Sequence, residues 1–230
     1  TKSLQKSSEP FQPELFDLYN LYQYIFLNKR TTILEFGSGW SSLVFIAALN
    51  NLKKMYLSKT KNLQRKNLFE IFIVENEKKY LDITKKNIKK FMKENNIKNI
   101  KITYFLSKVR MVNYNGNFAS EYEDLPLCNP DFIYLDGPGQ FNIYNKINNF
   151  TISHEDMMPM SCDILKFEYF LIPGTLIVVD GRGANSNYLK KEFKRKWFYK
   201  YDENNDQHLF LLRDNALGKK NKKLLHFYKN

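Results

Sequence analysis

The chain has 230 residues, of which 43% are hydrophobic, and its 36 Lys and Arg against 24 Asp and Glu give a formal net charge of +12. This length suits one α/β domain with a sizeable core, and two isolated cysteines, Cys128 and Cys162, exclude a disulfide framework and a zinc site. No apolar run is long enough to cross a bilayer, so we expect a cytoplasmic protein without a membrane partner.

The positive charge has two interpretations. A basic protein can bind an acidic partner such as nucleic acid. Here the excess is carried mainly by Lys residues that are scattered among Asn and Ile, without an arginine-rich tract. That distribution favours a solvated surface, and hence a small-molecule substrate over nucleic acid.

The beginning of the chain predicts an arm, a helix and a strand. Residues 1–13 are polar and contain two prolines, whereas apolar residues recur at helical spacing through Glu14–Leu27. Thr32–Phe36 reads as a short buried strand that ends in glycines, and Ser41–Leu49 continues as an apolar helix. We expect residues 1–30 to form an arm and helix that act as a lid or as the contact of a homodimer, and the sequence does not choose between these roles.

The middle of the chain repeats the alternation of strand and helix. The predicted elements are a helix or loop at Lys53–Asn67, a strand at Glu70–Val74 ending at Glu75, a charged amphipathic helix at Glu77–Glu94, a strand at Ile100–Leu106, a weak helical segment near the polar stretch Asn113–Asn117, and a fourth strand at Asp131–Asp136.

The last part predicts a helix at Met157–Leu171, a fifth strand at Gly174–Val179 and a helix at Asn185–Phe193. Trp197–Tyr201 and His208–Leu212 form a closing hairpin. The lysine-rich chain after Leu217 is expected to fray.

These elements predict an α/β fold. Because parallel neighbours need crossover connections, five strands that alternate with helices favour a doubly wound, mostly parallel sheet with helices on both faces. The closing antiparallel hairpin brings the sheet to seven strands. We expect this domain to span residues 31–217, followed by a basic tail at 218–230, with the ligand at the carboxyl ends of the strands.

The most informative segment is Ile33–Ser42, in which Glu35 precedes the turn Gly37-Ser38-Gly39 and Trp40. Glycines after a buried strand let the backbone approach a ligand, while the next helix presents free N–H groups. The third glycine of a dinucleotide fingerprint would fall at Ser42, and nicotinamide enzymes usually leave the position of Glu35 apolar. The pattern therefore indicates a site for a nucleoside and argues against NAD.

This segment resembles the first motif of the class I S-adenosylmethionine-dependent methyltransferases, whose Rossmann-like fold has the predicted architecture. In that family an acid at the end of the second strand binds the ribose hydroxyls, which corresponds to Glu75 here. The resemblance continues in the fourth strand, up to Asp136, and in the fifth, up to Asp180. It implies S-adenosylmethionine as cofactor, bound by Glu35, Gly37, Ser38, Gly39, Trp40, Glu75 and Asp136. Acids that end strands also cap helices, and this alternative applies to Glu75.

Asp136 and Asp180 end neighbouring strands, so both are expected to face one crevice and to be the catalytic residues. In the catechol-type O-methyltransferases, which the chain resembles here, such aspartates bind magnesium. Gly181 stands where that family usually has Asn, so a divalent ion on Asp136 and Asp180 is the less favoured alternative.

Four further residues are candidates for substrate binding. Arg182 can clamp an anionic group or pair with Asp180. Phe141 and Tyr144 can line a pocket or pack, and His154 can act as a base or stay a solvated loop residue.

The predicted function is methyl transfer from S-adenosylmethionine to a small polar acceptor, by O-methylation and with a sugar as one candidate acceptor, because two carboxylates can remove a hydroxyl proton. The alternatives are a nucleic-acid methyltransferase on the same fold, a non-catalytic nucleotide-binding or interaction module, and a nicotinamide oxidoreductase.

Overall fold

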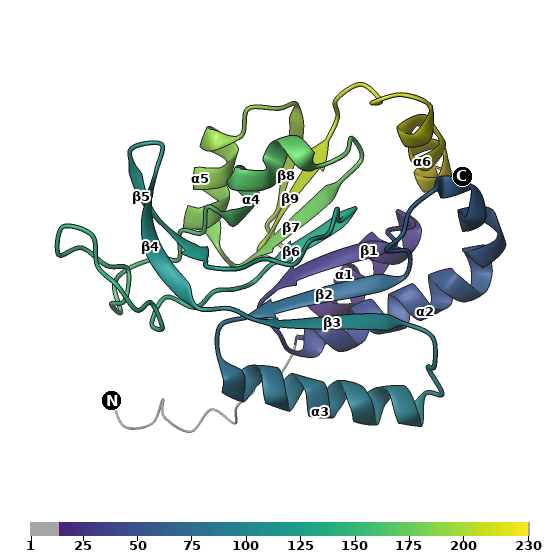
Figure 1. Cartoon of the computed structure of the whole chain (residues 1–230), viewed down its shortest axis with the longest axis horizontal. Helices are drawn as coiled ribbons and strands as arrows, with labels where there is room; N and C mark the ends of the chain where they lie inside the picture. Colours follow the sequence, from purple (N-terminus) through teal and green to yellow (C-terminus); the bar gives the residue numbers. More distant parts are fainter. Residues whose placement is uncertain (1–13, 230) are drawn as a thin grey trace.

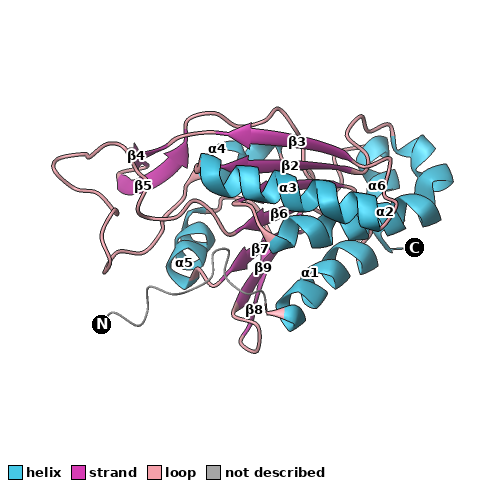
Figure 2. Ribbon diagram, turned by 90° about the horizontal axis from the view of Figure 1, so that it is seen from below, coloured by secondary structure: helices cyan, strands magenta, loops and turns pink. Residues whose placement is uncertain are grey.

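The computed structural model describes residues 14–229, which form a central sheet covered by helices on both faces (Figures 1 and 2). The predicted arm at residues 1–13 lies outside the described residues. Within the described part of the chain, no helix combines the length and apolarity needed to cross a bilayer.

The main sheet has seven strands in the order β3-β2-β1-β6-β7-β9-β8. Its first five strands are parallel, and β9 pairs antiparallel with both β7 and β8. The strands are β1 (Thr32–Phe36), β2 (Glu70–Glu75), β3 (Lys101–Leu106), β6 (Phe132–Leu135), β7 (Leu176–Asp180), β8 (Trp197–Asp202) and β9 (Gln207–Leu212). The predicted doubly wound, mostly parallel seven-stranded α/β sheet with a closing antiparallel hairpin is confirmed.

Helices cover the two faces in separate groups. The helices are α1 (Leu15–Leu27), α2 (Trp40–Thr60), α3 (Lys78–Glu94), α4 (Asp163–Phe167), α5 (Gly183–Glu192) and α6 (Lys219–Lys229), with 3-10 turns η2 (Lys61–Leu63) and η3 (Glu168–Phe170). Since strand side chains alternate between faces, Ile33 and Ile71 pack with α1, α2 and α3, whereas Leu34 and Phe72 pack with α4 and α5. The first half of the basic segment Lys53–Asn67 belongs to α2.

The prediction of a weak helix near Asn113–Asn117 is wrong. This part forms a two-stranded hairpin, β4 (Val109–Tyr114) and β5 (Asn117–Tyr122), outside the main sheet. Asn115 and Gly116 make its turn with φ of 50° and 82°. An Asn-Gly pair favours this left-handed turn, which is the signal that the helical interpretation overlooked.

The helix predicted at Met157–Leu171 is much shorter, because α4 begins only at Asp163. The residues before α4 follow an irregular path, in which side chains form hydrogen bonds with backbone groups. Asp163 accepts hydrogen bonds from the Tyr122 backbone N–H and from the Ser161 hydroxyl, at 3.0 and 2.7 Å. These bonds, of which the one from Tyr122 is long-range, replace the helical bonds that the sequence pattern predicted.

The C-terminal segment does not fray but forms α6, which lies at the opposite end of the molecule from the β4–β5 hairpin (Figures 1 and 2). Leu224, Phe227 and Tyr228 lie on one face of this helix and are buried. The Tyr228 hydroxyl donates to Asp131, which immediately precedes β6, at 3.0 Å. These apolar residues recur at helical spacing among many lysines, a pattern that the prediction of a frayed tail overlooked. Their packing holds α6 against the amino ends of the strands.

Candidate functional site

The turns after β1 and β6 lie in direct contact at the carboxyl edge of the sheet. Gly37 has φ of +97°, a conformation that other residues rarely adopt. A Cβ atom on Gly137 would lie 2.6 Å from the Gly37 backbone nitrogen. Glycine at both positions therefore allows the two turns to touch, which places Asp136 beside the glycine turn.

Glu35 lies beneath this turn and is fully buried. Its two carboxylate oxygens accept hydrogen bonds from the hydroxyls of Ser41 and Ser42, at 2.5 and 2.7 Å. Burial raises the pKa of Glu35 to about 8, although both serine hydroxyls act in the opposite direction. Glu35 thus holds the start of α2. Its partners Ser41 and Ser42 lie at and beside the position where a dinucleotide fingerprint has its third glycine.

Glu75 meets the same turn from the end of β2. Its carboxylate accepts a hydrogen bond from the Ser38 hydroxyl at 2.7 Å, and from the backbone N–H groups of Asn76 and Glu77 at 2.8 and 3.0 Å. Burial raises its pKa despite these three bonds. The two interpretations of Glu75 are thus compatible: it binds N–H groups at the start of α3, and it contacts the glycine turn.

The surroundings of this contact contain features that suit a ligand. A Cβ atom on Gly39 would have no neighbour within 4 Å, so the space beside it is open. Trp40 is 39% exposed at the first position of α2. The side-chain amide nitrogen of Asn76 is buried and has no hydrogen-bond partner. An unpaired buried donor is costly, and a bound acceptor atom would remove that cost.

Next to the two turns lies an open cleft of about 620 Å³. Both predicted catalytic aspartates line it, so the structure brings Asp136 and Asp180 to one crevice as expected. The Tyr134 hydroxyl, from β6, donates to Asp180 at 2.5 Å. The other lining residues come from α1, the loops after β6 and β7, and the β8–β9 turn: Glu14, Asp17, Gln140, Met158, Pro159, Gly181, Arg182, Glu203, Asn204, Asn205 and Asp206.

Asp136 has an environment suited to proton transfer. Its side chain lines the cleft and is 54% exposed. This partial desolvation raises its pKa to about 7; Arg182 lowers it, while Asp180 and Glu75 raise it. Burial also raises the pKa of Asp180, against the effect of the hydrogen bond from Tyr134. Asp136 therefore changes charge near neutral pH.

Arg182 points to the loop after β6. Its guanidinium donates to the backbone carbonyls of Asp136 and Pro138, the latter at 2.8 Å. Its Nε lies 3.8 Å from an Asp136 carboxylate oxygen. Arg182 thus holds this loop, and it pairs with Asp136 rather than with Asp180.

The other three predicted substrate residues lie in the long loop between β6 and α4, outside the lining of the acidic cleft. Phe141 and Tyr144 are exposed, and the Tyr144 hydroxyl donates to Glu123 at 2.6 Å. His154 is also exposed, and its Nδ1 accepts the Asp156 backbone N–H at 3.1 Å. The structure does not bring these side chains to Asp136 and Asp180.

The donor set of the cleft does not fit a bound divalent cation. Among residues 14–229, no group of three or more His, Cys, Asp and Glu side chains is arranged to hold a metal ion. Asp180 is bound by Tyr134, and Asp136 lies beside Arg182. A hydroxyl thus binds the Asp180 carboxylate, and a guanidinium lies beside the Asp136 carboxylate.

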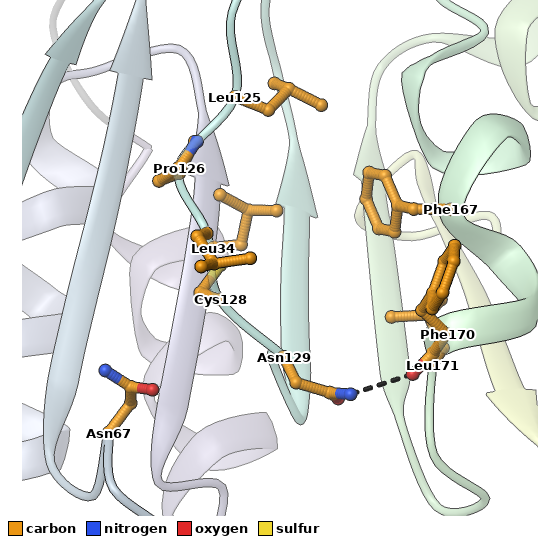
Figure 3. A pocket seen from close by; sticks show the side chains of 10 residues that line it. Leu34, Asn67, Leu125, Pro126, Cys128, Asn129, Phe167, Phe170 and Leu171 are labelled. Atoms are coloured by element: carbon orange, nitrogen blue, oxygen red, sulfur yellow. Dashed lines mark hydrogen bonds between the residues drawn. The ribbon is translucent and has the colours of Figure 1, made fainter.

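A different cavity, of about 520 Å³, lies on the sheet face that α4 covers (Figure 3). It is lined mainly by apolar side chains, including Leu34, Leu125 and Phe167. Asn129, just before β6, donates to the Phe170 carbonyl at 2.8 Å (Figure 3). Cys128 also lines it, and burial raises the pKa of that thiol to about 12. This cavity lacks the carboxylates of the cleft at the opposite strand ends.

Several residues of the cleft carried no signal in the sequence. Asp17 looked like an ordinary acid in the first turn of a helix, and only the packing of α1 brings it to Asp180. Asp206 ends the acid-rich segment between β8 and β9, whose composition indicates no more than a turn. Tyr134, two residues before Asp136, was a usable signal, because alternation along a strand puts both side chains on one face.

No protein-family model and no curated protein matches this chain. Among solved structures, it is similar to a putative caffeoyl-CoA O-methyltransferase from Staphylococcus aureus, with 14% identity, 89% of this chain and 86% of that chain covered, and a TM-score of 0.49. An O-methyltransferase from Bacillus cereus in complex with SAH is 12% identical, with 92% of this chain and 86% of that chain covered and a TM-score of 0.48. A putative O-methyltransferase from Klebsiella pneumoniae has 10% identity, coverage of 90% and 84%, and a TM-score of 0.39. At these identities the ligand of this chain has to be inferred from its own residues.

Proposed function

We propose that this chain is an S-adenosylmethionine-dependent methyltransferase that acts on a small polar acceptor, by O-methylation. The observation that carries the proposal is the contact between Ser38 in the glycine turn and Glu75 at the end of β2, at 2.7 Å. It joins the two sequence features that the family resemblance assigns to the nucleoside, beside the open space at Gly39.

The residues around this contact fit the cofactor. A carboxylate can accept from two ribose hydroxyls at once, so Glu75 would exchange its bond from Ser38 for bonds from the ligand. The unpaired Asn76 amide offers a further donor. When bound, S-adenosylmethionine supplies a methyl group that is already activated by a sulfonium. The protein then mainly has to place the acceptor in line with it.

On the acceptor side, Asp136 is the proposed proton acceptor. It adjoins the glycine turn through Gly137 and lines the cleft, so it can reach both the donor and the acceptor. With a pKa raised to about 7, its carboxylate is a useful base near neutral pH. Asp180, oriented by Tyr134, would bind and position the acceptor.

The charge of the cleft disfavours a nucleic-acid acceptor. Carboxylates from α1, β7 and the β8–β9 turn surround the place that a target base would enter. A phosphate backbone approaching this surface would be repelled. The net positive charge of the chain therefore lies elsewhere and does not mark the proposed acceptor site.

Titration calorimetry with S-adenosylhomocysteine tests the proposal. We expect saturable binding to the wild-type chain, and about 10- to 100-fold weaker binding to Glu75→Ala, because charged hydrogen bonds are lost. Glu77→Ala is the matched control, since its backbone N–H still reaches Glu75. Glu75→Gln retains an acceptor oxygen for the α3 start and checks that weaker binding does not come from unfolding.

Absence of heat with the wild-type chain would contradict the proposed cofactor. Thermal stabilisation by NAD instead of S-adenosylhomocysteine would favour the oxidoreductase. Binding of the cofactor without methyl transfer to any compound of a metabolite extract would favour the non-catalytic module.

A further inference from the structure

We propose that the methyl acceptor is a small organic cation, a hydroxylated ammonium compound whose positive charge is bound between α1, Asp180 and the β8–β9 turn. The inference rests on the proposed function, because it takes the acidic cleft as the acceptor site. It narrows the class of acceptor from polar to cationic.

The first observation is the charge of a cavity that four separate parts of the chain build. Six carboxylates line it: Glu14, Asp17, Asp136, Asp180, Glu203 and Asp206. Arg182 is the cation among its lining residues, and two of its donors are taken by the carbonyls of Asp136 and Pro138. In a chain with a net charge of +12, this concentration of negative charge does not follow from composition.

Most of these carboxylates have no counter-charge. Within residues 14–229, the ion pair of Arg182 with Asp136 is the one that involves this group of six. Asp17 accordingly has its pKa raised to about 6, first by burial, then by the negative charge of Asp180 and Glu14. A bound cation would remove this repulsion, whereas a neutral compound would leave it and an anion would add to it.

The second observation is independent of charge. Gln207 is fully buried, and neither its amide nitrogen nor its amide oxygen has a hydrogen-bond partner. It is the direct partner of Asp180 across β7 and β9, so both side chains lie on the same face of the sheet. Its amide lies close enough to the Asp180 carboxylate to lower the pKa of that group. Its unpaired amide oxygen therefore adds an acceptor dipole beside Asp180, which favours a cation held by that carboxylate.

The arrangement also orients the acceptor. Asp136 lies at the end of the cleft next to the glycine turn, which is the donor side. Asp17 and Asp206 lie on α1 and on the β8–β9 turn, which are tied together by a hydrogen bond from Asn20 to Asn205 at 2.9 Å. The ammonium group would thus sit at the α1 side, with a hydroxyl directed to Asp136.

Three probes of nearly equal size isolate the charge: ethanolamine, ethylene glycol and glycolate. Each is titrated into isotopically labelled protein saturated with S-adenosylhomocysteine, and amide shifts are followed by NMR. We expect ethanolamine to give saturable shifts at Asp180, Gly181 and Asp206, with a dissociation constant at least about tenfold below that of ethylene glycol, and glycolate to give none. Added salt should weaken the ethanolamine response.

The matched variants are the double change Asp17→Asn with Asp206→Asn, and the control Asp82→Asn on α3. The double variant should bind ethanolamine at least about tenfold more weakly, and the control should bind it as the wild type does. No saturable response to ethanolamine, a response that ethylene glycol or glycolate equals, or an undiminished response in the double variant would overturn the inference. A chain that binds ethanolamine but not S-adenosylhomocysteine would instead refute the proposed function on which the inference rests.

Discussion

The turn after β1 and the cleft beyond β6 and β7 both contain carboxyl groups with raised pKa values, but they differ in what surrounds the oxygens. In the turn, Glu35 and Glu75 accept hydrogen bonds from Ser41, Ser42 and Ser38. In the cleft, Asp136 is 54% exposed to the cavity. The comparison teaches that an acid at the end of a strand holds the local backbone where protein groups donate hydrogen bonds to its oxygens. Where its oxygens face a cavity instead, the same carboxylate is available to a ligand.

Changing Asp136 should have the largest effect on methyl transfer, because it removes the proposed base, the carboxylate that is exposed to the cleft. Asp136→Asn is expected to lower the rate of labelled methyl transfer by about 10²- to 10⁴-fold. In the wild-type chain the rate should rise with pH through about 7, where Asp136 loses its proton, and the variant should lack this rise. An unchanged pH profile would remove Asp136 from proton transfer.

Changing Gly137 should disturb the contact that joins the two regions. A Cβ atom there would lie 2.6 and 2.8 Å from the nitrogen and Cα of Gly37 and 2.8 Å from the Tyr122 hydroxyl. Because backbone atoms must move, Gly137→Ala is expected to cost about 1–3 kcal/mol of unfolding free energy.

Thermal unfolding measures this cost, which corresponds to a melting temperature lower by roughly 3–10 °C. Gly139→Ala is the matched control two residues away, where a Cβ atom has no neighbour within 4 Å. Equal melting temperatures for the two variants would show that the turns are not in the close contact described above.

Changing Glu35 should have the smallest effect and tests whether it is architectural. Its pKa rises from 4.5 to about 8 on folding, so the folded state favours the protonated form. The stability that this form contributes is fully present below pH 4.5 and is lost as pH rises through 8. Glu35→Gln imitates the protonated form, so its melting temperature should rise relative to that of the wild type as pH increases from 5 to 9.

Glu70→Gln provides the opposite control. Hydrogen bonds from Lys101, Asn67 and Thr103 lower the pKa of Glu70 although burial acts the other way. The stability contributed by its charged form is present above its unfolded pKa and is lost as pH falls. This variant should therefore lose stability relative to the wild type as pH rises from acid toward neutral. The same trend in Glu35→Gln would show that Glu35 is charged in the folded chain.

Much of the fold followed from local patterns. Strands such as Thr32–Phe36 and Glu70–Glu75 are short and mostly apolar, and Glu77–Glu94 has one apolar face, so their types were predictable. The errors came where distant contacts outweighed local preference. The segment after Leu217 is a helix because Leu224, Phe227 and Tyr228 find the amino ends of the strands to pack against. Met157–Met160 is not helical, because its neighbour Ser161 and Asp163 are bound to β5.

The sequence by itself determined the alternating sheet, the glycine turn and the acids at strand ends, because each depends on residues close together in the chain. Only the tertiary structure decided that Glu75 reaches Ser38 and that Asp17 and Asp206 face Asp180. Both facts depend on how segments far apart in the chain pack together, which local spacing does not record. The acidity of the cleft is thus a property of the folded chain, since carboxylates from four segments create it.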